Sequence, residues 1–161
     1  METQEFVDLL KFENKNLELV REEEPFLDET LTYLVMALAH DCCAWDDPRK
    51  GMEANLELIE SVARYGAILE DQWKPEGILV FGGKLEQDES TYNSYLRRAL
   101  ELRNGLLQQH MAYFNDSEKA LRETNTCLTY MIAIGCARST DLDGSLRFVD
   151  KTFRKVMDGL L

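Results

Sequence analysis

The chain has 161 residues, of which 45 % are hydrophobic and 30 % are charged, and its formal net charge is −12. This length and hydrophobic content predict one domain, 1–161, with a substantial core rather than a disordered chain. The negative charge argues against nucleic acid and anionic membranes as partners, because both are bound mainly through Lys and Arg. A basic protein surface is electrostatically allowed as a partner.

The charge is unevenly distributed along the chain. Residues 1–89 contain 22 acidic and 8 basic side chains, whereas residues 90–161 contain 8 acidic and 10 basic ones. The first part therefore has a net charge of −14 and the second a net charge of +2. This asymmetry makes the N-terminal half the candidate for contact with a basic partner.

The cysteines and the N-terminus indicate the compartment. Cys42, Cys43, Cys127 and Cys136 lie in apolar, helix-like stretches, and none forms a C-x-x-C pair. This arrangement is typical of reduced core thiols rather than of a disulfide framework. The first residues, METQEFVDLLKFE, lack the basic and long apolar regions of a signal peptide. We therefore expect a cytoplasmic protein.

A predicted helix over residues 3–24 opens the chain, with one apolar stripe along it. Glu22, Glu23 and Glu24 lie at its C-terminal end, where the helix macrodipole disfavours acidic side chains. Pro25 stops this helix. Because these glutamates destabilise the end of the helix, they are candidates for partner binding. A solvated acidic turn is the simpler interpretation.

The most apolar segment is Phe26–Trp45, FLDETLTYLVMALAHDCCAW. From Leu31 to Ala39 only Thr32 is polar. Such a run predicts a helix that is buried nearly all round, and it is too short to span a bilayer. We expect Asp46, Asp47 and Pro48 to end it, within a turn DDPRKG.

Further helices are predicted over 52–72 and 90–114. Another begins at an Asn115–Glu118 capping box and runs to about Arg138, and the last covers about 144–159. The helix over 52–72 has two apolar faces and should pack against two neighbours. Between the helices, Trp73–Glu89 contains one proline and three glycines, which predict an irregular segment. The predicted fold class is therefore all-α: a compact bundle of about six helices, three on either side of residues 73–89.

The two apolar helices resemble each other in sequence. Thr32–Ala39 can be aligned with Thr129–Cys136, a spacing of 97 residues, and the segments 59–64 and 149–154 align at a spacing of 90. We hypothesise that residues 1–72 and 90–161 are two related three-helix halves. The alternative is that any two buried helices built from Leu, Ile, Ala and Met look alike.

Motifs for catalysis or cofactor binding are weak. Gly77–Leu85 departs from a phosphate-binding loop, because an extra Gly83 precedes Lys84 and Leu85 replaces the hydroxyl residue. No Glu-x-x-His pair or G-x-S-x-G setting is present. No cofactor is therefore predicted.

A metal site is the alternative hypothesis. His40, Cys43 and Asp47 fall on one helix face and are zinc-ligand types, with Asp41 beside them. Glu57 and Glu60 form one Glu-x-x-Glu pair of the kind that binds magnesium in helical nucleotide hydrolases. The competing interpretation is a packed histidine, core thiols and solvated carboxylates. This hypothesis describes a small metal-dependent hydrolase or a ligand-binding protein.

Aromatic side chains suggest interaction instead. Trp45 and Trp73 flank the helix over 52–72, and Tyr92 and Tyr95 begin the aromatic stripe of the next helix. Aromatic residues often anchor interfaces, although they also complete cores. The leading hypothesis is a non-enzymatic module, such as an inhibitor, adaptor or chaperone, that engages a basic protein surface. A homodimer with the aromatic stripe as its seam is a variant of this hypothesis.

Overall fold

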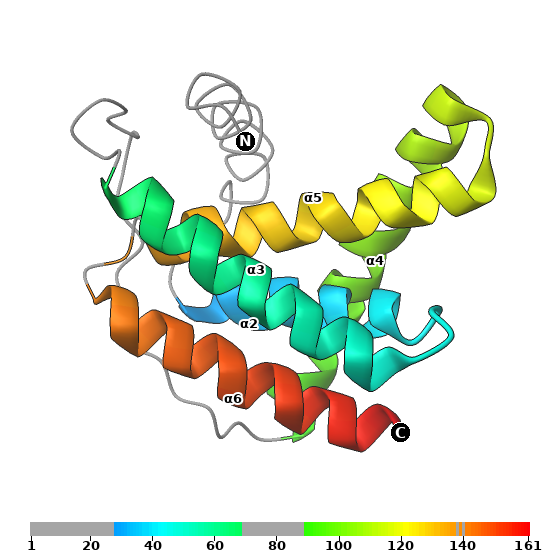
Figure 1. Ribbon diagram of the computed structural model, residues 1–161. Coiled ribbons are helices and arrows are strands. Elements are labelled where there is room, and N and C mark those ends of the chain that lie inside the picture. Colours follow the sequence, from blue (N-terminus) through cyan, green and yellow to red (C-terminus); the bar gives the residue numbers. More distant parts are fainter. Residues whose placement is uncertain (1–27, 69–88, 138, 140) are drawn as a thin grey trace.

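The computed structural model describes residues 28–68, 89–137, 139 and 141–161. Within these ranges it contains no strand, which confirms the predicted all-α class. Five helices form a compact bundle (Figure 1): α2 (Asp28–Cys42), α3 (Pro48–Ile68), α4 (Glu89–Phe114), α5 (Ser117–Ala137) and α6 (Leu142–Leu160). The predicted helix over 3–24 and the predicted irregular segment, up to residue 88, lie outside the described residues.

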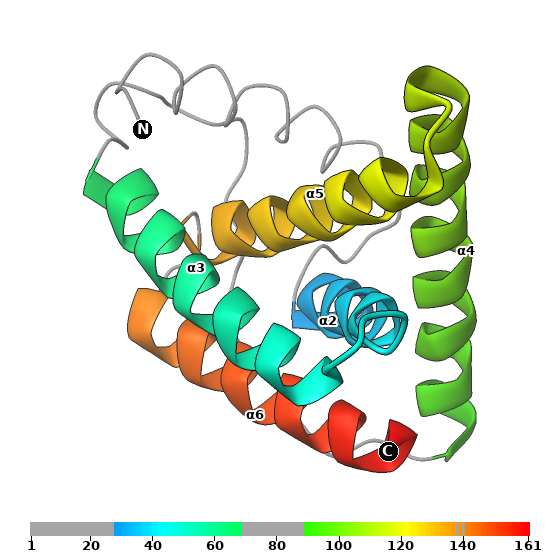
Figure 2. The same ribbon diagram turned by 45° about the vertical axis from the view of Figure 1, so that its right-hand side comes forward.

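Helix α2 lies at the centre of the bundle, where it packs against α3, α4, α5 and α6. Figure 2 shows it nearly end-on, with the other four helices around it. Every residue from Leu31 to Ala39 is buried, as the apolar run predicted. None of the described helices is both long and apolar enough to cross a membrane.

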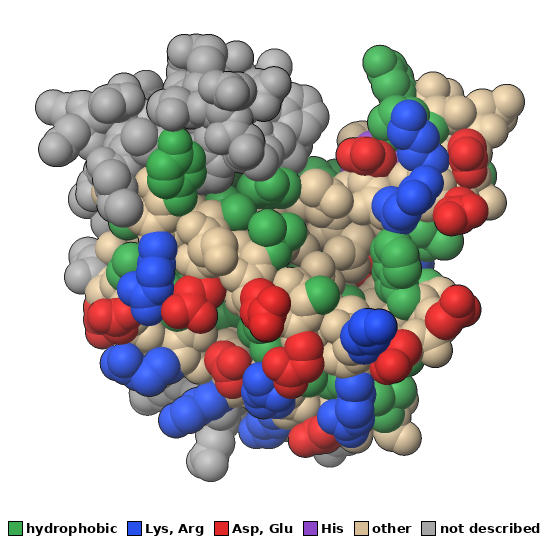
Figure 3. Space-filling view, viewed as in Figure 1, with side chains coloured by type: hydrophobic (Ala, Val, Ile, Leu, Met, Phe, Trp, Pro, Cys, Tyr) green, Lys and Arg blue, Asp and Glu red, His purple; other side chains and the backbone are tan. Residues whose placement is uncertain are grey.

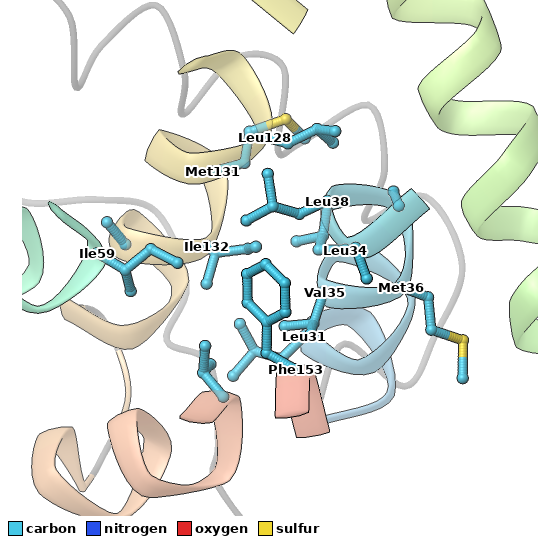
Figure 4. Close-up of a cluster of buried hydrophobic side chains, with 14 of the residues drawn as sticks. Leu31, Leu34, Val35, Met36, Leu38, Ile59, Leu128, Met131, Ile132 and Phe153 are labelled. Carbon is cyan, nitrogen blue, oxygen red and sulfur yellow. The ribbon is translucent and has the colours of Figure 1, made fainter. Parts of the chain in front are cut away.

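The core forms where α2 meets the second apolar helix, α5, whose residues Cys127–Ala137 are all buried. Figure 4 shows side chains of α2 packed against Ile132 of α5, Ile59 of α3 and Phe153 of α6, whereas Met36 points away towards α4. Each of these side chains is at most 1 % exposed. Burial of a large apolar side chain contributes about 1.5–3 kcal/mol, so the residues of this contact stabilise the fold strongly.

Two helices begin earlier than predicted, and a capping side chain explains each start. Helix α3 begins at Pro48 rather than at residue 52, since Asp47 Oδ1 accepts a hydrogen bond from the Lys50 backbone N–H at 3.1 Å. Proline is favoured at the first helical position, where its missing N–H costs nothing. Helix α6 begins at Leu142 rather than at about residue 144, because the Asp141 side chain accepts a hydrogen bond from the Gly144 N–H at 2.9 Å.

The turn between α4 and α5 also differs from the prediction in its capping residue. Asp116, and not Asn115, accepts the backbone N–H groups of Glu118 and Lys119, at 3.1 and 3.2 Å. Asn115 instead adopts a left-handed conformation with φ 52°, which asparagine tolerates better than most residues. Tyr113, near this tip, is 83 % exposed.

Helices α3 and α6 lie side by side and antiparallel, and ion pairs join them. Arg49 pairs with Asp158 and Arg64 with Asp143, each at 3.0 Å, while Arg154 makes a two-pronged pair with Glu53. Helix α3 packs against both α5 and α6, so the expectation of two neighbours is confirmed. Its second predicted apolar face is only partly buried, however, because Leu58 is 39 % exposed.

Candidate functional site

A buried carboxylate at the end of α2 organises the most polar part of the interior. The Asp41 side chain is 0 % exposed, and its Oδ1 accepts a hydrogen bond from Arg103 Nε of α4 at 3.1 Å. Its Oδ2 accepts the Asn125 Nδ2 group of α5 at 2.9 Å and, more weakly, the Trp45 indole N–H at 3.5 Å. A buried charge is tolerated only when it is paired and hydrogen-bonded in this way.

The position of Asp41 explains why so many donors converge on it. Asp41 lies in the last turn of α2, where the helix macrodipole disfavours a negative charge. The Ala44 and Trp45 backbone N–H groups close the turn on the carbonyls of Asp41 and Cys42, each at 3.0 Å. Arg103, whose side chain is 17 % exposed, supplies the compensating charge from a neighbouring helix.

A second group of polar side chains continues this network towards α3. Asn55 Nδ2 of α3 donates to Cys42 Sγ at 3.2 Å, and Thr129 Oγ1 of α5 donates to Asn55 Oδ1 at 3.4 Å. Burial raises the pKa of the Cys42 thiol to about 11, although hydrogen bonds from the Asn55 and Asn125 side-chain amides oppose the rise. Cys42 is therefore a neutral thiol at pH 7, and it acts here as a hydrogen-bond acceptor in the packing.

His40 precedes this carboxylate and is half-buried. Burial lowers its pKa below the ordinary value of 6.5, and the charge on Arg103 lowers it further. Its Nε2 atom finds no hydrogen-bond partner in the part of the chain that the structure describes. The imidazole is therefore neutral at pH 7, and acid would have to charge it in a poorly solvated position.

The turn after α2 brings this network to the surface. Trp45 is 36 % exposed, and the next two residues, Asp46 and Asp47, are also exposed. We call residues 45–47 the acidic turn. The Trp45 indole N–H makes a long contact of 3.5 Å with the buried Asp41 carboxylate, while part of the residue remains exposed.

The candidate metal ligands do not gather in one place. His40 and Asp41 lie at the end of α2, and Cys43 is half-buried with its thiol 3.9 Å from the Met157 sulfur. Asp47 caps α3, and Glu57 and Glu60 are exposed farther along that helix. Among the described residues, no group of three or more His, Cys, Asp or Glu is placed to hold a metal ion.

The predicted partner-binding residues divide between the described and remaining parts of the chain. Trp45 is exposed, whereas Tyr95 is half-buried and packs against the core. The triplet Glu22–Glu24, Trp73 and the Tyr92 side chain lie outside what the structure describes.

The sequence-based reasoning missed Arg103 and Asn125. Arg103 follows Arg97 and Arg98 on a charged stretch of α4, which reads as a solvated face, and Asn125 lies between two threonines. The one available signal was Asp41 itself, because a carboxylate that directly follows a buried apolar run needs a donor from elsewhere in the fold. This pattern predicts that a donor within the fold contacts Asp41, but it does not identify the donor.

Comparison with known proteins yields no match to this chain among protein-family models, curated proteins or solved structures.

Proposed function

We propose that this protein is a non-enzymatic interaction module that binds a basic surface on a partner protein, in the manner of an inhibitor, adaptor or chaperone. The observation that supports this most directly is the acidic turn, in which Trp45 is exposed between a buried carboxylate and two surface aspartates. Tryptophan is enriched among the residues that dominate binding energy, and acidic neighbours favour a basic counterpart.

The buried network supports a role for Trp45 in binding rather than in the core. Arg103 and Asn125 hold Asp41, and the Trp45 indole N–H lies 3.5 Å from the Asp41 carboxylate. A side chain that is already ordered loses less conformational entropy when a partner covers it. The turn itself is short and is closed on both sides by helices α2 and α3.

The distribution of charge agrees with this proposal. The described residues contain 17 acidic and 12 basic side chains, and the remaining residues contain 13 and 6. More than half of the net charge of −12 therefore comes from residues 1–27, 69–88, 138 and 140. Such a charge raises the association rate with a basic partner at low ionic strength.

A titration with a lysine-rich model peptide tests the proposal. In a Trp73→Phe background Trp45 is the only tryptophan, so the tryptophan emission reports contact with the acidic turn. We expect a shift at about 20 mM salt that is lost at about 500 mM, where the Debye length falls below about 5 Å. An unchanged emission at low salt contradicts the proposal.

A matched pair of variants separates the acidic turn from net charge. Asp46→Asn with Asp47→Asn removes two charges from the turn, and asparagine retains the capping ability of Asp47. Glu57→Gln with Glu118→Gln removes two charges from exposed positions on α3 and α5. Binding should weaken at least tenfold more in the first variant than in the second. Equal weakening would mean that the peptide responds to net charge alone.

We also propose that the two halves of the chain, 1–72 and 90–161, are related. Arg64 of α3 pairs with Glu60 on its own helix and with Asp143 of α6. Ninety positions later, Arg154 of α6 pairs with Asp150 on its own helix and with Glu53 of α3. The acidic partners are also 90 residues apart, because Glu60 corresponds to Asp150 and Glu53 to Asp143. A shift of 90 residues therefore converts the helix-internal ion pair of Arg64 into that of Arg154, and it exchanges the two helices in the pairs that join α3 to α6.

The packing of the helices supports the same relation. Helix α2 packs against α6 and α5 packs against α3, which are equivalent contacts if α2 corresponds to α5 and α3 to α6. Ile59 and Val149, also 90 residues apart, are both buried. In a crystal structure, segments 31–39 and 52–66 should superpose as a pair on 128–136 and 142–156. Helix directions that do not coincide would rule out the relation.

A further inference from the structure

The last part of α4 lacks charge, although much of it is exposed. In a chain of which 30 % is charged, residues 104–115 contain no Asp, Glu, Lys or Arg. The other two stretches of ten or more residues without these side chains are 30–40 and 124–137. Most of each of those stretches is buried in the core. Burial in the core does not account for most of the uncharged part of α4, so this part needs a different explanation.

The apolar side chains in this part of α4 divide between two faces. Leu102 and Leu106 pack against the core. Leu107, Met111 and Phe114 follow one another at helical spacing and form a second face. Among the described residues, the core cluster includes none of these three side chains. Met111 is 39 % exposed and the other two are half-buried. We call these three residues the α4 face.

The end of the α4 face has a fixed arrangement. Tyr113 lies edge-on to Phe114 with ring centroids 4.9 Å apart, and Lys119 Nζ lies 4.6 Å from the centroid of the Phe114 ring. His110 joins α4 to α5 through a contact of 2.9 Å with Thr124 Oγ1. Figure 1 and Figure 2 place this end of α4 at the outer edge of the bundle, and Figure 3 shows hydrophobic side chains at the surface there, at the upper right. An ordered apolar surface loses little conformational entropy when a partner covers it.

The α4 face begins beside the acidic turn. Arg103, the residue before the uncharged stretch, contacts the Asp41 carboxylate at 3.1 Å, and the Trp45 indole N–H lies 3.5 Å from the same carboxylate. Leu107 lies on the same side of α4 as Arg103 and one helical turn later, a rise of about 6 Å. An exposed tryptophan with two aspartates and an apolar helix face therefore lie next to each other.

We propose that the α4 face extends the interface of the acidic turn, and that the partner segment is a basic amphipathic helix. The apolar side of that helix lies on the α4 face, and its lysines or arginines meet Asp46 and Asp47. Recognition of an amphipathic helix through its apolar side is a common mode of peptide binding. The centre of such an interface is depleted of charge and enriched in Met and aromatic residues. This inference rests on the proposed function, because it names the kind of basic surface that the acidic turn engages.

Charge complementarity favours a basic helix over the other occupants of the α4 face. The chain's own segment 3–24 contains seven acidic and three basic side chains, and a second copy of the chain has a net charge of −12. Either of them brings more negative charge to Asp46 and Asp47, which repel it. A basic helix brings the opposite charge to the turn and an apolar side to the α4 face.

Two peptides of about 18 residues, equal to about five helical turns, test the docking. Both contain the same leucines and lysines, but only the amphipathic peptide places its leucines along one side of a helix, whereas the scrambled peptide spreads them evenly. The full chain in the Trp73→Phe background is titrated with each peptide at low salt, and the Trp45 emission gives the dissociation constant. The amphipathic peptide should bind at least about tenfold more tightly than the scrambled peptide, because only its leucines can be covered together.

Met111→Gln and Leu58→Gln form a matched pair of variants. Both side chains are 39 % exposed on helices, and glutamine is a good helix former. Met111→Gln should weaken binding of the amphipathic peptide about fivefold, because it removes an apolar contact, and should leave the scrambled peptide unaffected. Leu58→Gln, on α3, should change the affinity for either peptide less than about twofold, because it lies outside the interface. Far-UV circular dichroism confirms that both variants are folded.

Equal affinities for the two peptides, or equal effects of the two variants, overturn the inference, and the proposed function stands if both peptides still bind. If neither peptide binds at low salt, the proposed function fails and the inference fails with it. Sedimentation velocity and urea unfolding test the other occupants. A dimer that Met111→Gln dissociates assigns the α4 face to a second copy. A loss of stability in Met111→Gln as large as that of a core truncation assigns the face to the chain itself. Either result also overturns the inference.

Discussion

Removal of Arg103 provides the most direct test of the buried network. Arg103→Met takes the only cation from the described surroundings of Asp41, which is fully buried, and leaves the amide of Asn125 and the distant indole N–H. Removing one partner of a buried ion pair typically costs about 3–5 kcal/mol. Since Arg103 is 17 % exposed and Asn125 remains, we expect the lower end of this range, about 3 kcal/mol.

Urea unfolding followed by far-UV circular dichroism at pH 7 and 25 °C measures this loss. Arg64→Met is the matched control, because Arg64 makes two ion pairs at an exposed position and should therefore change the free energy of unfolding little. A double-mutant cycle with Asp41→Asn isolates the pair, and the double variant should be more stable than the sum of the single losses indicates. If Arg103→Met costs no more than Arg64→Met, the network does not stabilise the fold.

Three further predictions follow from burial, titration and capping. Leu34→Ala should lower the free energy of unfolding by about 2–5 kcal/mol, because Leu34 is 0 % exposed in the core, and a thermal shift near zero would contradict its burial. The pKa of His40 is lowered by burial, so the unfolded chain binds a proton more readily below pH 6.5. Stability from this group is complete above pH 6.5 and declines as pH falls towards the lowered pKa, so His40→Gln should flatten urea midpoints measured between pH 7.5 and 5.5. Gly144→Ala would bring a Cβ within 2.2 Å of the capping Asp141 carboxylate and should destabilise α6 by about 1 kcal/mol or more. Gly105→Ala, with nothing within 4 Å, should instead stabilise α4 by up to about 1 kcal/mol in thermal unfolding, and the same sign for both variants would refute the capping argument.

The apolar helices were predictable because their signal is local. A run such as Leu31–Ala39, with a single polar residue, can only be accommodated by burial on every side, whichever helices surround it. The same reasoning applies to Cys127–Ala137, which is also fully buried. Helix starts were less predictable, since Asp47 and Asp141 each compete with neighbouring polar residues for the capping position.

The chain sequence by itself determined the helical class, the two apolar helices at the centre and the excess of negative charge. It also placed an acid, Asp41, directly after a buried run. Only the tertiary structure decided what surrounds that acid, because Arg103 and Asn125 are 62 and 84 residues away and reach it through the packing of α4 and α5. Periodicity reports which face of a helix is apolar, but the partner of each face depends on how whole helices pack. For that reason Trp45 was identifiable as a candidate anchor from its sequence, whereas its contact with a buried carboxylate was not.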